Sequence, residues 1–187
     1  MQIFKFYINY FKTLDALQKI IFDFYIQKND SRDPALHEQH LHKARIALLS
    51  AMKKIRLGMA QTEHKNLEKF ENLYEIVFSL NTLKLRIPDY TTFEVCETEF
   101  KKISDSLSEL LQHFRNCLKN KNVTLDSTAK MLGKLSNTID RLEELYRGTL
   151  QVIAKDPTLF LFFLQDLIAL RDTLESLFLG LFNASSP

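Results

Sequence analysis

The chain of 187 residues has little of what breaks helices and little of what supports common catalytic motifs. It contains four glycines, four prolines, two cysteines and no tryptophan. So few breakers over this length exclude a fold of many short strands and turns, and they favour long helices. The sequence also lacks a glycine-rich phosphate loop, a nucleophile elbow and a Cys-x-x-Cys motif. We therefore expect a protein that is not an enzyme, with no catalytic residues and no cofactor.

Long apolar runs are missing as well. The most apolar stretch, 159–182, is interrupted by Gln165, Asp166, Arg171, Asp172 and Glu175, whereas a membrane span needs about 20 mostly apolar residues. The net charge is only +2, and no recognised nucleic-acid reader motif is present, so we expect no nucleic-acid partner. The length and the 45% hydrophobic content fit one globular domain over residues 1–187.

What the chain does have is apolar residues repeated at alternating steps of three and four. The three clearest series start at Phe93, Leu132 and Phe160, and each continues for seven or eight members. Such spacing keeps side chains on one stripe of an α-helix, as in the seams of helical bundles. The pattern predicts an all-α fold, an antiparallel bundle of five to six long helices. We expect these helices at residues 2–28, 34–57, 63–85, 91–118, 125–154 and 157–182, and Gly58 leaves open whether the second and third are continuous.

Both cysteines, Cys96 and Cys117, occupy positions in the first seam. They are 21 residues apart on one predicted helix, so about 31 Å separates them, far beyond the reach of a disulfide. Free cysteine in a seam acts as a small hydrophobic residue. We therefore interpret both as reduced packing residues.

Three histidines, His37, His40 and His42, lie close together near the start of the second predicted helix. A zinc site needs three or four ligands, and the zincin motif needs His-Glu-x-x-His, whereas the spacing here is one residue short. No inward Glu-x-x-His pair of the di-iron kind is present either. We predict a solvated polar first turn and no metal site.

The main charge asymmetry is the stretch from Gln39 to Thr62, which contains no acidic residue. One interpretation is contact with anionic lipid headgroups or an acidic partner. The other is an ordinary solvated face, balanced by acids of the third helix at Glu63, Glu68, Glu71 and Glu75. The candidate contact residues are Lys43, Arg45, Lys53, Lys54 and Arg56.

The first and last predicted helices carry more apolar residues than their seams require. Surplus apolar surface is typical of a partner site, a dimer interface or a position near a bilayer, although such stripes also form ordinary cores. The candidate residues for an apolar interface are Phe4, Phe6, Phe11, Phe178, Leu179 and Phe182.

The middle of the chain resembles a known family. Its segment 73–80 reads LYEIVFSL and is followed by Leu83, Arg86, Tyr90, Phe93, Cys96 and Phe100; ARIALL precedes it at 44–49 and LQDLIAL follows at 164–170. This order resembles the soluble helical region of the fusaric-acid-resistance (FUSC) family, in its subgroup of large bacterial inner-membrane proteins. That region lies between two groups of membrane helices.

The resemblance implies a non-catalytic cytoplasmic domain of a FUSC-like efflux transporter, excised from a larger membrane protein and located at the cytoplasmic side of the bacterial inner membrane. Its role would be assembly or regulation, and its partner would be the membrane part of the same protein, another protein or a second copy in a homodimer. The alternative is a free-standing helical adaptor or secreted bacterial effector that acts through protein–protein interaction.

Overall fold

The computed structural model describes residues 2–27, 31–59, 64–86, 90–122, 124–150 and 158–183. These residues form an all-α bundle, as the sequence predicts, and no strand occurs among them. Six helices are long: α1 (Gln2–Ile26), α2 (Pro34–Gly58), α3 (His64–Leu80), α6 (Glu97–Asn120), α7 (Leu125–Leu145) and α9 (Thr158–Asn183). Two short helices, α4 (Leu83–Arg86) and α5 (Tyr90–Val95), join α3 to α6.

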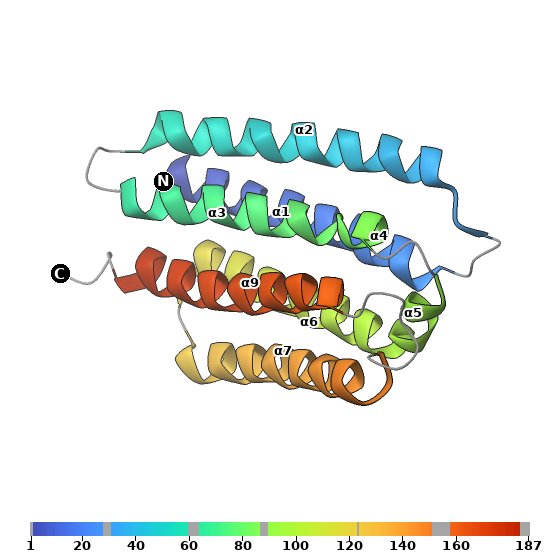
Figure 1. The fold of residues 1–187 in the computed structure, drawn as a ribbon. Helices are drawn as coiled ribbons and strands as arrows, with labels where there is room; N and C mark the ends of the chain where they lie inside the picture. The colour runs from blue at the N-terminus through green and yellow to red at the C-terminus, as the bar shows by residue number, and fades with distance from the viewer. Residues whose placement is uncertain are drawn as a thin grey trace.

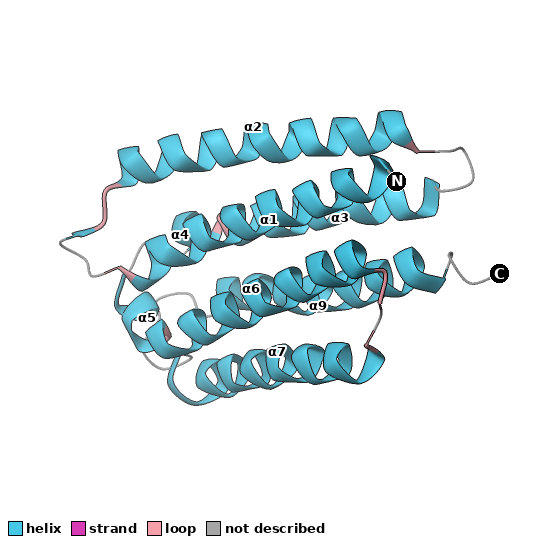
Figure 2. Cartoon of the chain, turned by 180° about the vertical axis from the view of Figure 1, so that it is seen from behind, coloured by secondary structure: helices cyan, strands magenta, loops and turns pink. Residues whose placement is uncertain are grey.

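The long helices are stacked in an antiparallel arrangement, and successive ones run in opposite directions (Figure 1). Helix α1 packs between α2 and α6, and α9 packs between α3 and α7. The result is a centre of four helices, α1, α3, α6 and α9, with α2 and α7 as the outermost helices on opposite sides (Figures 1 and 2).

Nearly all predicted seam residues lie in one continuous core. In α6 the side chains from Phe100 to Cys117 at seam positions are buried, and in α9 the whole seam from Phe160 to Leu181 is buried. Burial of a large apolar side chain stabilises a fold by about 1.5–3 kcal/mol. The alternating steps of three and four therefore identified the faces that hold the bundle together.

Two predicted helices are shorter or more broken than expected. The predicted fourth helix is interrupted at Cys96, which caps the start of α6 with φ −95° and ψ 3°, so its seam continues across a turn. The predicted third helix ends at Leu80, and α4 follows as a separate turn. Helix α2 ends at Gly58, and the next residue, Met59, is extended, so α2 and α3 are separate helices.

A π-helical turn, η3 (Tyr146–Leu150), ends α7 and changes which residue faces the core. The sequence seam continues from Tyr146 to Thr149, but Thr149 is exposed and Leu150 is fully buried. A π turn closes over one more residue than an α turn, which places Leu150 where Thr149 was expected. The next seam member, Ile153, lies outside the described residues.

The start of α1 and the end of α9 lie at the same end of the bundle, which we call the terminal end; the opposite end is the far end (Figure 1). At the terminal end two glycines allow neighbouring helices to approach closely. A β-carbon on Gly58 would come within 3.1 Å of the Phe6 ring, and one on Gly180 within 2.6 Å of Asn66. The ends of α2 and α9 therefore pack directly against the beginnings of α1 and α3.

Candidate functional site

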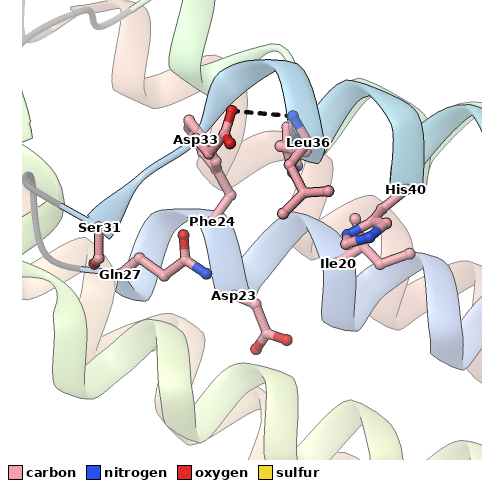
Figure 3. Close-up of a pocket in the computed structure, with 9 residues that line it drawn as sticks. Ile20, Asp23, Phe24, Gln27, Ser31, Asp33, Leu36 and His40 are labelled. Carbon is pink, nitrogen blue, oxygen red and sulfur yellow. Dashed lines mark hydrogen bonds between the residues drawn. The ribbon is translucent and has the colours of Figure 1, made fainter.

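A pocket of about 260 Å³ lies at the far end, between the last turns of α1 and the start of α2 (Figure 3). Gln27 and His40 flank it, and Asp33 lies at its rim as the residue that caps α2 (Figure 3). The carboxylate of Asp33 accepts a hydrogen bond of 3.1 Å from the Leu36 backbone N–H, as is typical before a proline at the first helical position. One of the pocket's two carboxylates is therefore already used in folding.

Two ionisable groups of the pocket have pKa values shifted in the direction that disfavours their charged forms. Burial raises the pKa of Asp23, although nearby Lys19 opposes this shift. Burial also lowers the pKa of His37, against the effect of its hydrogen bond to Asn81. No group of three or more His, Cys, Asp or Glu side chains that could hold a metal ion occurs in the described part of the chain. Burial thus acts against the charged forms of Asp23 and His37, and nothing in the pocket specifies a ligand.

The three histidines separate into different environments, which corrects part of the sequence prediction. His37 is not solvated: its ring stacks on Phe24 at 4.3 Å between ring centres, and its Nε2 donates to Oδ1 of Asn81 at 3.0 Å. His40 lines the pocket and is exposed, as is His42. The predicted polar first turn therefore holds for two histidines and is wrong for His37, which links α2 to the segment after α3.

A buried polar cluster, which we call the α1–α6 polar cluster, joins these two central helices. Asp15 accepts hydrogen bonds from Gln18 at 3.1 Å and from Ser108 at 2.6 Å, and Arg115 lies 3.4 Å from its second carboxylate oxygen. Gln18 also exchanges hydrogen bonds with Ser104, through the side-chain hydroxyl and the backbone carbonyl. Each polar group has a partner, as burial requires, so the cluster has a structural role.

Sequence reasoning missed this cluster, although a signal was present. Asp15 and Gln18 are three residues apart, so they share a helix face, and both interrupt an otherwise apolar side of α1. Their partners on α6 lie 86 to 100 residues away in the sequence, so the pairing itself could not be read from spacing.

A cysteine and a histidine meet in α6, but without the electrostatics of an activated thiol. The sulfur of Cys117 lies 3.6 Å from His113 Nε2, which in turn is 2.7 Å from the Thr128 hydroxyl. Burial raises the pKa of Cys117 and lowers that of His113, whereas a nucleophilic cysteine needs a lowered pKa. Burial likewise raises the pKa of Cys96 to about 12. Both thiols are buried in the core, which confirms their interpretation as packing residues.

The five cations of the basic stretch on α2 do not act as one group. Arg56 pairs with Glu71 at 2.6 Å, and Arg45 donates to the Tyr74 hydroxyl at 2.7 Å while its guanidinium lies over the Phe78 ring. The prediction that acids of the third helix balance the basic stretch is therefore confirmed for Arg56.

The other three cations of α2 are exposed, and no ion pair joins them to an acid within the described ranges. Lys53 and Lys54 lie near the terminal end, whereas Lys43 lies ten residues earlier, about 15 Å along the helix. The structure therefore leaves Lys53 and Lys54 as the pair available to a partner at this end.

The predicted apolar interface is wrong for two of its six residues. Phe11 and Phe178 are buried, because both pack against Phe114 in the core. Phe4, Phe6 and Phe182 are half-buried, and Leu179 is 40% exposed. Only these four keep accessible surface, and they belong to the start of α1 and the end of α9, which lie at the terminal end (Figure 1). None of the described helices combines the length and apolar character needed to cross a membrane.

Comparison with known proteins adds no relative: no protein-family model, no curated protein and no solved structure matches this chain. The resemblance to the FUSC family therefore stays a prediction.

Proposed function

We propose that this chain is a non-catalytic helical domain of a membrane protein similar to the FUSC-like transporters, with an assembly or regulatory role on the cytoplasmic side of the bacterial inner membrane. The observation that carries this proposal is the position of α1 and α9. The start of α1 and the end of α9 lie at one end of the bundle (Figure 1). A domain inserted between two groups of membrane helices needs this arrangement, because the chain must leave the membrane and return to it on the same side.

The side-chain chemistry is consistent with a binding role. Burial favours the neutral forms of both Cys117 and His113, and the polar groups of the α1–α6 polar cluster are satisfied within the fold. The far-end pocket contains one carboxylate already used as a helix cap. These groups stabilise structure, so we assign the function to the surface.

The proposal can be tested on the native protein with an antibody raised against the bundle. We expect the antibody to detect a chain clearly larger than the 21.9 kDa of these residues, in the membrane fraction and resistant to extraction by alkaline carbonate. Protease applied to intact spheroplasts should leave the epitope protected, because the domain faces the cytoplasm. A 22-kDa chain in the soluble fraction would refute the proposal.

A second candidate, a free-standing adaptor that binds another protein, is favoured by the middle of α2. Ile46 is 54% exposed and Leu49 is 42% exposed, and neither lies near the terminal end. The same fractionation separates the two candidates, since an adaptor predicts the soluble 22-kDa chain.

A further inference from the structure

Exposed lysines from several helices gather at the terminal end. They come from the start of α1, the last turns of α2, the start of α3 and the end of α6, which all lie at this end (Figures 1 and 2). Within the described residues no ion pair joins any of them to an acid. The six lysines are Lys5, Lys53, Lys54, Lys65, Lys119 and Lys121.

Few acids offset these lysines. The described acids in the same turns are Glu68 near the start of α3 and Asp126 in the first turn of α7. The nearby Glu71 is already paired with Arg56 at 2.6 Å. Among the described residues, the terminal end therefore carries an excess of positive charge, although the net charge of the whole chain is only +2.

Two leucines project from the same end. Leu57, in the last turn of α2, is 76% exposed, and Leu125, at the start of α7, is 62% exposed. Helices α2 and α7 are the outermost helices on opposite sides of the bundle (Figure 1). A partner that contacts both leucines and the lysines between them must therefore extend across the whole end.

We infer that the terminal end binds the surface of a bilayer that contains anionic phospholipids. Phosphate headgroups complement the lysines, and the boundary between headgroups and acyl chains accommodates projecting leucines. A bilayer is also extended enough to meet α2 and α7 at once, whereas a single peptide or nucleic-acid strand follows one groove. This inference rests on the proposed function, because it names the partner of the end from which the membrane helices would continue.

The direct test is sedimentation of the 187-residue chain with vesicles of phosphatidylcholine, with or without phosphatidylglycerol. We expect binding only to the anionic vesicles, weakened by added salt.

Each lysine near an anionic surface contributes about fivefold to affinity, so K53E/K54E should lower the vesicle affinity at least about 20-fold. The matched control is K101E/K102E, which reverses two exposed lysines at the far end and should leave affinity within about twofold. Circular dichroism verifies that both variants fold.

The inference would be overturned by no binding to anionic vesicles, by equal losses in the two double variants, or by tighter binding to a double-stranded DNA oligonucleotide than to vesicles. Soluble glycerol phosphate distinguishes a single headgroup site from an extended surface. It should leave vesicle binding intact, and complete displacement by it would also overturn the inference.

If the native protein is in the membrane fraction but the bundle does not bind vesicles, this inference fails and the proposed function stands. If vesicles bind and the native protein is soluble, only the proposed function fails.

Discussion

At the far end of the bundle Arg32 and Lys84 bind groups of the chain itself, whereas at the terminal end six lysines are exposed without an ion pair in the described structure. Arg32 donates to the backbone carbonyls of Phe24 and Tyr25, each at 2.9 Å. Lys84 pairs with Glu38 and also lies over the Phe24 ring. These contacts attach the segments around α2 and α4 to the end of α1. Arg32 and Lys84 therefore serve folding, whereas the six lysines of the terminal end are available for binding.

One aromatic side chain near each end illustrates a difference in burial. At the far end Phe100 is fully buried, and its ring contacts those of Tyr25 and Phe163 at 5.6 and 5.7 Å between ring centres. At the terminal end Phe4 is only half-buried. The Phe100 ring therefore contributes more to stability than the Phe4 ring, which retains accessible apolar surface.

The largest expected effect comes from removing a far-end ring. Phe100→Ala should lower the free energy of unfolding by about 3–5 kcal/mol, because it leaves a cavity in a closely packed core. Phe4→Ala should cost about 1 kcal/mol, since that ring buries less surface. Urea unfolding followed by circular dichroism measures both. Equal losses would show that the two ends are packed alike.

A smaller effect is expected from a single hydroxyl. Tyr25 donates a hydrogen bond of 2.5 Å to the Leu80 carbonyl, at the last residue of α3, where the helix supplies no donor of its own. Tyr25→Phe leaves that carbonyl buried without this donor, so we expect a loss of about 1–3 kcal/mol. The control is Tyr10→Phe. Tyr10 bonds the Phe70 carbonyl within α3, where a helical N–H remains, and we expect about 0.5–1 kcal/mol. A larger loss for Tyr10 would contradict this reasoning.

Acid should destabilise the far end through His37. Burial lowers the pKa of His37 from its ordinary 6.5, so the unfolded chain binds the proton more readily than the folded chain. The free energy of unfolding should therefore fall as the pH drops below about 6.5, by at most about 1.4 kcal/mol per pH unit for this group. In His37→Gln the free energy of unfolding should depend less steeply on pH. Part of the dependence should remain, because burial also lowers the pKa of His113. Denaturant titrations over a pH series measure the slope. The exposed His42 provides a control, since an identical change in His42→Gln would exclude His37 as the cause.

The smallest effect on stability, and the sharpest contrast between the ends, should come from two equally exposed leucines. Leu57 at the terminal end and Leu85 at the far end are both 76% exposed. Each Leu→Ser variant should change the free energy of unfolding by less than about 0.5 kcal/mol. Only Leu57→Ser should weaken binding to anionic vesicles. If Leu85→Ser weakened it equally, the distinction between the ends would be lost.

Much of the fold could be predicted from the sequence because the seams repeat over many turns. A long series such as Phe160 to Leu181 leaves one face for the core, whatever the neighbouring helix is. Local breaks were harder to predict. Cys96 continues the seam and yet lies in a turn between α5 and α6, and the π turn buries Leu150 where the spacing favoured Thr149. Both depend on tertiary packing, which can override a local pattern.

The candidate site was less predictable, because it depends on which helix ends lie together. The basic stretch on α2 drew attention to Lys53 and Lys54, but their association with Lys5, Lys65 and Lys119 follows from topology. The same stretch includes Arg45, which binds Tyr74 and Phe78, and its sequence context does not distinguish it from the exposed lysines. Similarly, Phe11 and Phe178 lie beyond the seams of their helices, and only the structure shows that Phe114 covers both.

The α1–α6 polar cluster has a further consequence for how the chain selects one native arrangement. The seams of the six long helices are built mostly from leucine, isoleucine and phenylalanine, so many wrong pairings of helices would bury similar apolar area. Gln18 of α1 bonds Ser104, and Asp15 bonds Ser108 and Arg115, only when α1 lies in this register against α6. Against another helix, or one turn out of register, these side chains would lose their partners on α6, at a cost of about 1–3 kcal/mol each. A few polar residues thus favour one pairing of helices, which the similar apolar residues alone do not distinguish.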